Sequence, residues 1–584
     1  MRAHLARLGL AATAAAAITF AVGFFLWPAT ITVQGYSYAL AWSLPATREC
    51  IARYAFSVLA PSSWDVCARF LEAGGGLAGF RGRIDVVLIA LACAAACLGT
   101  TWITRSTSTE RVIRGRQLCG ADALRKALAK ECAQLGDGLE ILPGIKISRD
   151  RESRHFLVWG SSGGGKTQAL LRLLLPAIAR GDRVIALDIK GDLTAGLPGG
   201  RSPPALIAPH DARSQVWDLA ADVRLVEEAE ELATRLIPVS DKDPMWGQAA
   251  GAVFVACVAS LQQRCGTEWT WHDLHDLVTS DVRRLYDLAD EFYPDARRLL
   301  EDAESRTTSS ILINLQTHMR IVRSLAVAWG DYKGRRRFSV RDWIMNDGGS
   351  HQVVILQRSA QFPALSAAWI GAMVSAAAAA LGDPALRESR RRRIWLALDE
   401  FPQLPRLNDF AAFLELGRSK GFCVALGVQD VAQLRKTYGA NLADAWLGII
   451  GTQVVCRINP GPAAEEASRL IGQQEVERPQ VTTQPAGAGA ARSSVTMHRD
   501  RRAVITPDEI ASTLGPQRRG VRVVILGPGA DVYRADLPYT TLPARRAPSK
   551  PAGWTLVDDL EQLTSVEPER STRSQQRERE HERG

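Results

Sequence analysis

The feature that most constrains the fold is an eight-residue loop between two apolar segments. Gly160, Ser161, Ser162, Gly163, Gly164, Gly165, Lys166 and Thr167 match the pattern GxxxxGK[ST] at every required position. Residues 155–159 before the loop predict a buried strand, and residues 168–175 after it predict a helix. A strand, a glycine-rich loop and a helix in this order predict an α/β fold with a phosphate-binding loop.

The residue types in this loop suit a nucleoside triphosphate. Glycines allow backbone N–H groups to converge on phosphate oxygens at the N-terminus of a helix. Lys166 is expected to neutralise the β- and γ-phosphates of ATP, and the Thr167 hydroxyl is expected to bind Mg²⁺. A glycine-rich turn with an unrelated lysine is the alternative, and the flanking strand and helix patterns argue against it.

A second acidic site follows another apolar segment. Residues 394–398 read Ile-Trp-Leu-Ala-Leu, which predicts a buried parallel strand ending at Asp399 and Glu400. Asp399 is expected to hold Mg²⁺ directly or through water, and Glu400 to orient and polarise the attacking water. The [NT]KxD motif of GTPases and the LSGGQ motif of transport cassettes do not occur in the sequence. An ATPase of the RecA-like class remains.

Other segments extend this pattern on both sides. Further strands are predicted at residues 184–188, 351–356, 424–428, 452–456 and 521–526. Residues 224–340 show amphipathic helical spacing and predict an all-α insertion between two parts of the nucleotide-binding domain. Asp188 and Lys190 stand at a predicted strand end, where functional and structural roles are both open. Residues 387–393 hold five arginines, for which a solvated loop is favoured over a DNA contact.

Two uncharged segments near the N-terminus predict membrane spans. At about 1.5 Å per residue, residues 8–27 and 86–104 match a hydrocarbon core of roughly 30 Å. A cleaved signal peptide is the alternative for the first segment, although such peptides have a shorter apolar region of about 7–15 residues. Because an ATP site needs cytosolic nucleotide, both termini are expected in the cytoplasm, with residues 28–83 in a periplasmic loop. A disulfide between Cys50 and Cys67 in this loop stays open.

With these motifs the chain resembles the type IV coupling proteins, the TraD- and TraG-like membrane ATPases of conjugation and type IV secretion. The resemblance rests on the strings HFLVWGSSGGGKT, ALDIKGDL, LALDEFPQL and GRSKGFCVALGVQD, on a closing TPDEI segment, and on the two spans. It implies a RecA-like homohexamer at the inner membrane that drives DNA transfer by ATP hydrolysis. Implied partners are single-stranded DNA, relaxase and relaxosome proteins, and channel components, and the net charge of +9 suits an anionic partner.

The resemblance also implies roles for two further residues. Gln429 follows a predicted strand, where the family places a glutamine that senses the γ-phosphate. Arg418 matches the position of an arginine finger that reaches the ATP of a neighbouring subunit, which makes hydrolysis depend on assembly. A turn residue and a surface arginine are the structural alternatives for these two positions.

The predicted domain order follows from these segments. It comprises a membrane anchor (1–104), a first part of the nucleotide-binding domain (105–223), the all-α insertion (224–340), a second part (341–544) and a disordered charged tail (545–584). The tail holds eight basic and eight acidic residues. A mobile loop is predicted at residues 479–494, which are rich in Gly, Ala, Pro and Gln.

Two other functions stay open on the sequence alone. The first is an ATP-binding receptor or adaptor for substrates that other ATPases move, and the intact Glu400 argues against it. The second is a motor for protein effectors rather than DNA, a choice on which the sequence is silent.

Overall fold

The computed structural model describes residues 30–39, 45–55, 61–82, 84–86, 89, 92, 111–239, 243–330, 335–346, 351–404, 406–407, 409–484 and 492–556. They fall into two compact units, the first within residues 1–113 and 476–500 and the second within residues 114–475 and 501–584. Each unit is described by itself. The two predicted spans lie outside the described residues, apart from Val86, Ile89 and Ala92.

The first unit contains a small fold between the two predicted spans. The hairpin of β1 (Thr30–Val33) and β2 (Tyr36–Ala39) precedes helices α2 (Pro45–Ala55) and α3 (Pro61–Ala73). Cys50 and Cys67 form a disulfide with a Cα–Cα distance of 5.7 Å, next to the buried Trp64, Leu71 and Phe80. The pairing that the sequence left open is therefore present.

A long hairpin replaces most of the mobile loop predicted at residues 479–494. Strands β16 (Gln473–Gln484) and β17 (Arg492–Ala503) join β3 (Arg111–Gly115) in a three-stranded sheet of order β17-β16-β3. The prediction was wrong for residues 479–484 and 492–494. The hairpin exposes residues 478–480 and 496–499 in succession, so the sequence lacks the apolar alternation that marks a half-buried strand.

The second unit is built on an eleven-stranded sheet with a parallel centre. Its order is β4-β20-β19-β15-β7-β14-β13-β8-β12-β9, with β18 paired to β19. The seven strands from β15 to β9 are parallel. Strand β19 is antiparallel to its neighbours β15, β18 and β20, and β20 is parallel to β4. In sheet order the strands cover Leu118–Cys119, Val532–Pro538, Gly520–Leu526, Thr452–Val455, Phe156–Trp159, Phe422–Val428, Ile394–Leu398, Arg183–Asp188, Val353–Gln357 and Ala205–Ile207, and β18 covers Gly515–Gln517. The α/β class and the predicted strands are confirmed.

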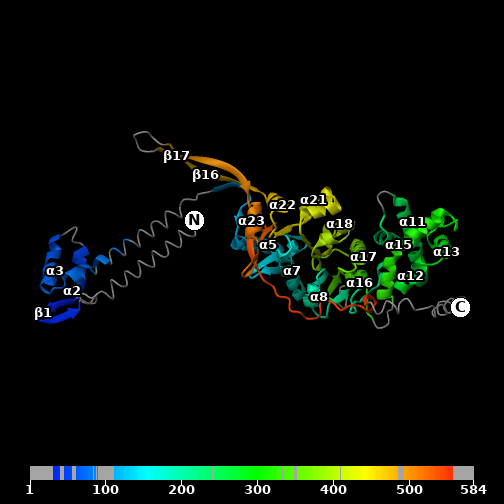
Figure 1. The fold of residues 1–584 in the computed structure, drawn as a ribbon, viewed down its shortest axis with the longest axis horizontal. Helices are drawn as coiled ribbons and strands as arrows, with labels where there is room; N and C mark the ends of the chain where they lie inside the picture. The colour runs from blue at the N-terminus through cyan, green and yellow to red at the C-terminus, as the bar shows by residue number, and fades with distance from the viewer. Residues whose placement is uncertain are drawn as a thin grey trace. The chain divides into compact units, whose positions relative to one another are not determined.

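Helices cover both faces of this sheet because its central strands are apolar along their length. In β7, Leu157 and Trp159 belong to one hydrophobic core and Phe156 and Val158 to the other. Helix α17 (Pro363–Gly382) packs in the first core, and α5 (Ala121–Leu135) and α7 (Lys166–Arg180) pack in the second (Figure 1). The remaining helices of this unit outside residues 226–329 are α6 (Arg149–Glu152), α8 (Asp192–Gly196), α9 (Leu219–Asp222), α16 (Val340–Met345), α18 (Phe410–Glu415), α19 (Gly417–Lys420), α20 (Val431–Tyr438), α21 (Ala440–Ile449), α22 (Pro462–Ile471) and α23 (Pro507–Thr513).

The described part of residues 226–329 consists of helices and their connections. The helices are α10 (Val226–Leu236), α11 (Pro244–Cys265), α12 (Trp271–Val278), α13 (Val282–Phe292), α14 (Pro294–Arg297) and α15 (Arg306–Trp329), and α11, α12, α13 and α15 gather together in Figure 1. Parallel strands β10 (Val216–Trp217) and β11 (Arg337–Phe338) bring the two ends of the segment together. That these helices form a domain of their own stays a prediction.

Two described helices, α11 and α17, are long and apolar enough to cross a membrane. Their most apolar windows are 72% and 78% buried inside the fold. Helices that are apolar on all sides and surrounded by protein are core helices. We therefore assign both to the core of the α/β fold and not to the predicted spans.

The segment after β20 is an extended strap, defined here as residues 539–556. Thr540 N–H donates to Gln168 Oε1 at 2.7 Å, and Trp554 Nε1 donates to Pro209 O at 2.8 Å. Arg546 lies between these contacts and donates through Nη2 to Leu197 O at 2.6 Å. The prediction of a disordered tail was therefore wrong for residues 545–556, because their partners lie far away in the sequence. Residues 557–584 lie outside the described residues.

Candidate active site

Three neighbouring parallel strands bring the predicted site residues to one edge of the sheet. Strand β14 lies between β7 and β13. The loop that begins at Gly160 follows β7, and Asp399 and Glu400 follow β13, so both leave the sheet at its carboxyl edge. Gln429 follows β14 and leaves between them. Groups far apart in the sequence are therefore neighbours in the fold.

The glycines of the loop are required by backbone shape and by close packing. Gly165 has a φ of +109°, and a Cβ there would lie 2.3 Å from Val521 Cγ1 of β19. A Cβ at Gly164 would lie 2.5 Å from Arg457 O. Larger residues at these positions would move the loop, so its shape at the N-terminus of α7 depends on glycine.

The polar side chains of the loop bind its own backbone and a neighbouring loop. Lys166 is 6% exposed, and its Nζ donates to Gly160 O at 2.9 Å. Asn459 N–H donates to Ser161 Oγ at 2.8 Å. The ammonium group therefore lies within the curve of the loop, where the pattern GxxxxGK[ST] places the cation for phosphate binding.

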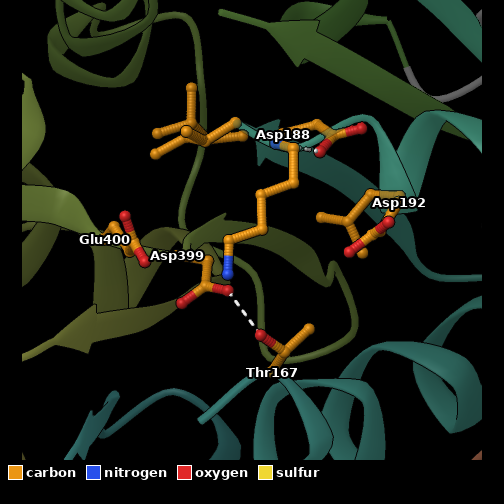
Figure 2. A pocket seen from close by; sticks show the side chains of 9 residues that line it. Thr167, Asp188, Asp192, Asp399 and Glu400 are labelled. Atoms are coloured by element: carbon orange, nitrogen blue, oxygen red, sulfur yellow. Dashed lines mark hydrogen bonds between the residues drawn. The ribbon is translucent and has the colours of Figure 1, made fainter. Parts of the chain in front are cut away.

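Thr167 and Asp399 meet directly across the site. Thr167 Oγ1 donates to Asp399 Oδ2 at 2.9 Å (Figure 2). Asp399 Oδ1 is buried and has no hydrogen-bond partner among the described residues. Burial raises the pKa of this carboxyl above its usual value. A buried carboxylate oxygen needs a partner, and oxygen ligands of this kind are those that Mg²⁺ prefers, so the residues present fit the expected metal site.

Glu400 has an unusual backbone conformation beside Asp399. Its φ is +60°, in the left-handed region that residues other than glycine rarely adopt, and the residue is 8% exposed. Gln403, in the 3-10 helix η2 (Phe401–Gln403), donates a side-chain hydrogen bond to the Glu400 carboxylate. Backbone strain at an expected catalytic residue is typical of active sites.

Gly427 in β14 belongs to the site although sequence reasoning missed it. A Cβ there would lie 2.6 Å from Asp399 Oδ1 and 3.1 Å from Glu400 N. The bare backbone of Gly427 lets the acidic end of β13 approach β14 closely. A glycine inside an apolar strand signals such an approach, and this signal could have found it.

The structure indicates different roles for Asp188 and Lys190, which the sequence left open. Gly191 N–H and Thr194 N–H donate to the Asp188 carboxylate at 2.8 and 2.6 Å, so Asp188 shapes the turn into α8. Lys190 lines a pocket with Asp399 and Glu400. Asp188 therefore shapes this turn, and Lys190 is a further candidate for binding phosphate.

A cleft that is open to solvent lies along these residues. On one side it is lined by the P-loop, Lys190 and the two acids, and on the other by Pro516, Val521 and Tyr539. These three residues belong to β18, β19 and the start of the strap. Sequence reasoning missed them because no local pattern marks residues that reach a site by long-range strand pairing.

Arg418 lies at the opposite edge of the sheet from Gln429. It precedes β14, and the seven residues of that strand span about 23 Å at about 3.3 Å per residue. Its side chain is 54% exposed and forms an ion pair with Asp150 Oδ1 at 3.1 Å. Burial alone would raise the pKa of Asp150, but hydrogen bonds from Arg418 and Arg154 lower it below its usual value. Gln429 thus follows β14 at the carboxyl edge of the sheet, on the same edge as the cleft but not among its lining residues, and Arg418 lies at the opposite edge.

His155 supports the segment that carries Arg418. Val424 N–H donates to His155 Nδ1 at 3.2 Å, so the proton is assigned to Nε2, which donates to Leu414 O at 3.1 Å. The ring is nearly fully buried, and burial lowers the pKa of His155 to about 4. The neutral imidazole therefore joins the start of β14 to the end of α18.

We expect His155 to make the folded protein less stable below about pH 6.5, the usual pKa of histidine. The unfolded chain takes up the proton near that pH, whereas the folded chain takes it up only near pH 4. The stabilisation is complete above pH 6.5, and about 3 kcal/mol of it is lost as the pH falls toward 4. The measurement is the free energy of unfolding in denaturant against pH. His155→Gln should flatten this limb, and a variant curve parallel to that of the wild type would contradict the assignment.

A family model and three curated relatives match this chain. The family model, described as the type IV secretion-system coupling protein DNA-binding domain, matches residues 139–537. The coupling protein TraD of Escherichia coli K12 is 28% identical over 401 residues, which cover 67% of this chain and 54% of TraD. A conjugal transfer protein TraG of Escherichia coli is 22% identical over 408 residues, which cover 63% of each chain. The chain thus spans about half the length of TraD and less than two thirds of TraG.

Solved structures of the conjugative coupling protein TrwB share the fold. The unbound TrwBdeltaN70 structure aligns with a TM-score of 0.61 at 22% identity, over 75% of this chain and 96% of that chain. TrwB in complex with ADP and Mg²⁺ aligns with the same score and identity, over 76% and 98% of the two chains. At this identity the likeness establishes the common fold.

Proposed function

Because this chain belongs to the type IV secretion-system coupling protein family, we propose that it hydrolyses ATP to drive DNA into a type IV secretion channel. The observation that carries the proposal is the Thr167–Asp399 contact, with an unpartnered Asp399 oxygen beside the P-loop. TrwB, which shares the fold, has been solved with ADP and Mg²⁺ and with a non-hydrolysable ATP analogue. ATP and Mg²⁺ are therefore the ligands proposed for the cleft.

In the proposed reaction, residues at three strand ends act on one triphosphate. Lys166 and the loop amides bind the phosphates, and Thr167 and Asp399 hold Mg²⁺. The metal, when bound, screens phosphate charge in the transition state. Glu400 accepts a proton from the attacking water. Gln429 leaves the sheet between the P-loop and Glu400, from where it contacts the γ-phosphate.

The proposed assembly is a homohexamer in the inner membrane. Residues 8–27 and 86–104 span it, residues 28–83 lie in the periplasm, and the bulk of the chain is cytoplasmic. The Cys50–Cys67 disulfide supports an oxidising compartment for residues 28–83. Arg418 lies on the far edge of the sheet and reaches the ATP of the next subunit. Single-stranded DNA, relaxase or relaxosome proteins and channel components are the proposed partners.

Glu400→Gln tests this function. We expect ATP hydrolysis by the full-length protein in lipid nanodiscs to fall about 100-fold or more, because the variant lacks the general base. ATP binding should change little, since the amide keeps the size of the carboxylate. The measurements are phosphate release, binding of a fluorescent ATP analogue, and the frequency of DNA transfer in cells.

The control for this variant is Glu304→Gln, which removes an exposed carboxylate outside the cleft and should behave as the wild type. A Glu400→Gln protein that transfers DNA at the wild-type frequency would refute the motor and assign the chain to the receptor or adaptor class. DNA transfer that fails while secretion of a protein substrate continues would separate the two kinds of cargo.

A further inference from the structure

The amino edge of the central sheet, opposite the cleft, carries an arginine face. We define this face as Arg149, Arg387, Arg390, Arg391 and Arg418. They come from α6, from the loop before β13 and from α19, three segments joined by hydrogen bonds. Arg149 Nη2 donates to Arg391 O at 3.0 Å, and Ser389 N–H donates to Ser419 O at 3.0 Å. Segments distant in sequence therefore form one continuous surface.

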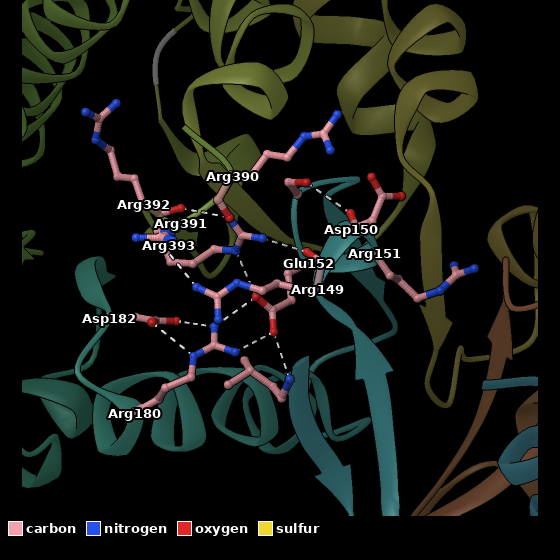
Figure 3. Close-up of polar contacts among 12 residues, drawn as sticks. Arg149, Asp150, Arg151, Glu152, Arg180, Asp182, Arg390, Arg391, Arg392 and Arg393 are labelled. Atoms are coloured by element: carbon pink, nitrogen blue, oxygen red, sulfur yellow. Dashed lines mark hydrogen bonds and ion pairs between the residues drawn. The ribbon is translucent and has the colours of Figure 1, made fainter. Parts of the chain in front are cut away.

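A buried network of charges fixes the loop beneath this face. The Glu152 side chain is fully buried and accepts hydrogen bonds from Arg180 at 2.7 Å and from Arg393 at 2.9 Å (Figure 3). Arg180 also pairs with Asp182, which accepts a hydrogen bond from Trp395 Nε1 at 2.9 Å. Removing one member would leave a buried charge without its partner, so the network strongly resists movement of the loop.

Two exposed arginines above this network have guanidinium groups that no carboxylate of the described residues neutralises. Among the described residues, the side chains of Arg390 and Arg391 have no ion pair with a carboxylate, and both are exposed. Asp150 is already engaged by Arg154 and Arg418. The loop is thus rigid at its base while its guanidinium groups remain available, which is the arrangement expected of a prepared anion-binding surface.

The anion that this face binds does not come from the cleft of the same chain. Strand β14, at about 23 Å, separates the two edges of the sheet. Non-specific sites for single-stranded nucleic acid combine cations with aromatic side chains on which bases stack. None of the described residues of α6, of the loop before β13 or of α19 is an exposed aromatic residue. These observations favour a compact group of phosphates held by another protein.

We propose that the arginine face docks on the cleft of a second copy of this chain, where Arg390 and Arg391 bind the nucleotide phosphates alongside Arg418. The proposal rests on the proposed function, since it takes ATP as the occupant of that cleft. In the cleft, the charges of Asp399 and Glu400 are balanced by those of Lys166 and Lys190. The two surfaces therefore become complementary in charge when a triphosphate occupies the cleft. Guanidinium groups suit this role because they bind phosphate with two parallel hydrogen bonds.

The first test measures self-association of the full-length protein in detergent, with a non-hydrolysable ATP analogue bound. R390A/R391A should raise the concentration needed for assembly at least 10-fold. The matched control, R283A/R284A, removes two adjacent exposed arginines of α13 and should leave it unchanged. Fluorescent ATP binding and thermal unfolding check that each variant is folded, and R390K/R391K serves as the second variant if the alanine pair unfolds.

The second test mixes R390A/R391A with K166A, each of which should be nearly inactive alone. In a mixed assembly, the K166A subunit supplies an intact arginine face to the intact cleft of the other variant. ATP hydrolysis should then exceed the sum of the separate proteins at least 5-fold. Unchanged assembly, or no recovery on mixing, overturns the proposal. Weaker binding of single-stranded DNA with normal assembly also overturns it and assigns the face to nucleic acid. A wild type that assembles with the analogue but never hydrolyses ATP instead refutes the proposed function.

Discussion

Replacing Lys166 by alanine is expected to lower ATP hydrolysis by about 1,000-fold, the upper end of the range for loss of one charge-stabilising donor. The ammonium group is nearly buried and lies within the curve of the P-loop. Because water is largely excluded there, no solvent ion replaces its interaction with the phosphates. The measurement is phosphate release at saturating ATP, together with the dissociation constant for ATP, which should rise.

The matched control is Lys436→Ala, which removes an exposed lysine of α20. It should hydrolyse ATP at the wild-type rate. If Lys166→Ala and Lys436→Ala gave the same rate, the phosphate-binding role of Lys166 would be wrong, and the hydrolysis would belong to another site or a contaminant.

Arg418→Ala is expected to lower hydrolysis by about 1,000-fold or more without weakening ATP binding to single subunits, as for other arginine fingers. Strand β14, about 23 Å long, separates the residue from the edge of the sheet that carries the cleft, and the Arg418 side chain is half exposed. Its effect should therefore appear only in assemblies. The wild-type rate per subunit should rise steeply with protein concentration, whereas the variant rate should stay low at every concentration.

Two controls separate this role from a loss of surface charge. Arg320→Ala removes an exposed arginine of α15 and should leave the rate unchanged. Arg418→Lys should restore little activity, because an ammonium group cannot form the two parallel hydrogen bonds of a guanidinium group. An Arg418→Ala protein whose rate still rises with concentration as in the wild type would show that the residue is only a surface ion pair with Asp150.

The sequence predicted those parts of the site that lie next to apolar strands. The P-loop follows Phe156–Trp159 and the acid pair follows Ile394–Leu398, so a continuous apolar run and its polar end locate both groups. The parallel sheet then follows from the alternation of buried strands with helices. For these elements, local pattern and tertiary structure agree.

Other features depend on contacts between distant segments, and the sequence did not reveal them. Val521 and Tyr539 line the cleft only because β19 and β20 extend the sheet from its parallel centre. Residues 545–556 of the strap were predicted to belong to a disordered tail, because their order comes from distant partners such as Leu197 and Pro209. Amino-acid composition indicates which residues prefer water, but it does not indicate which backbone groups form hydrogen bonds with distant segments.

Strand β14 has a consequence for the timing of the proposed ring. One buried strand carries Gln429 at one end and the segment of Arg418 at the other. In a closed ring, each such strand would connect the ATP site of its own subunit to the ATP site of the next subunit. A packed strand moves as a whole, so loss of a γ-phosphate at one end would displace the finger that serves the next site. The order in which neighbouring sites hydrolyse ATP would then depend on this strand.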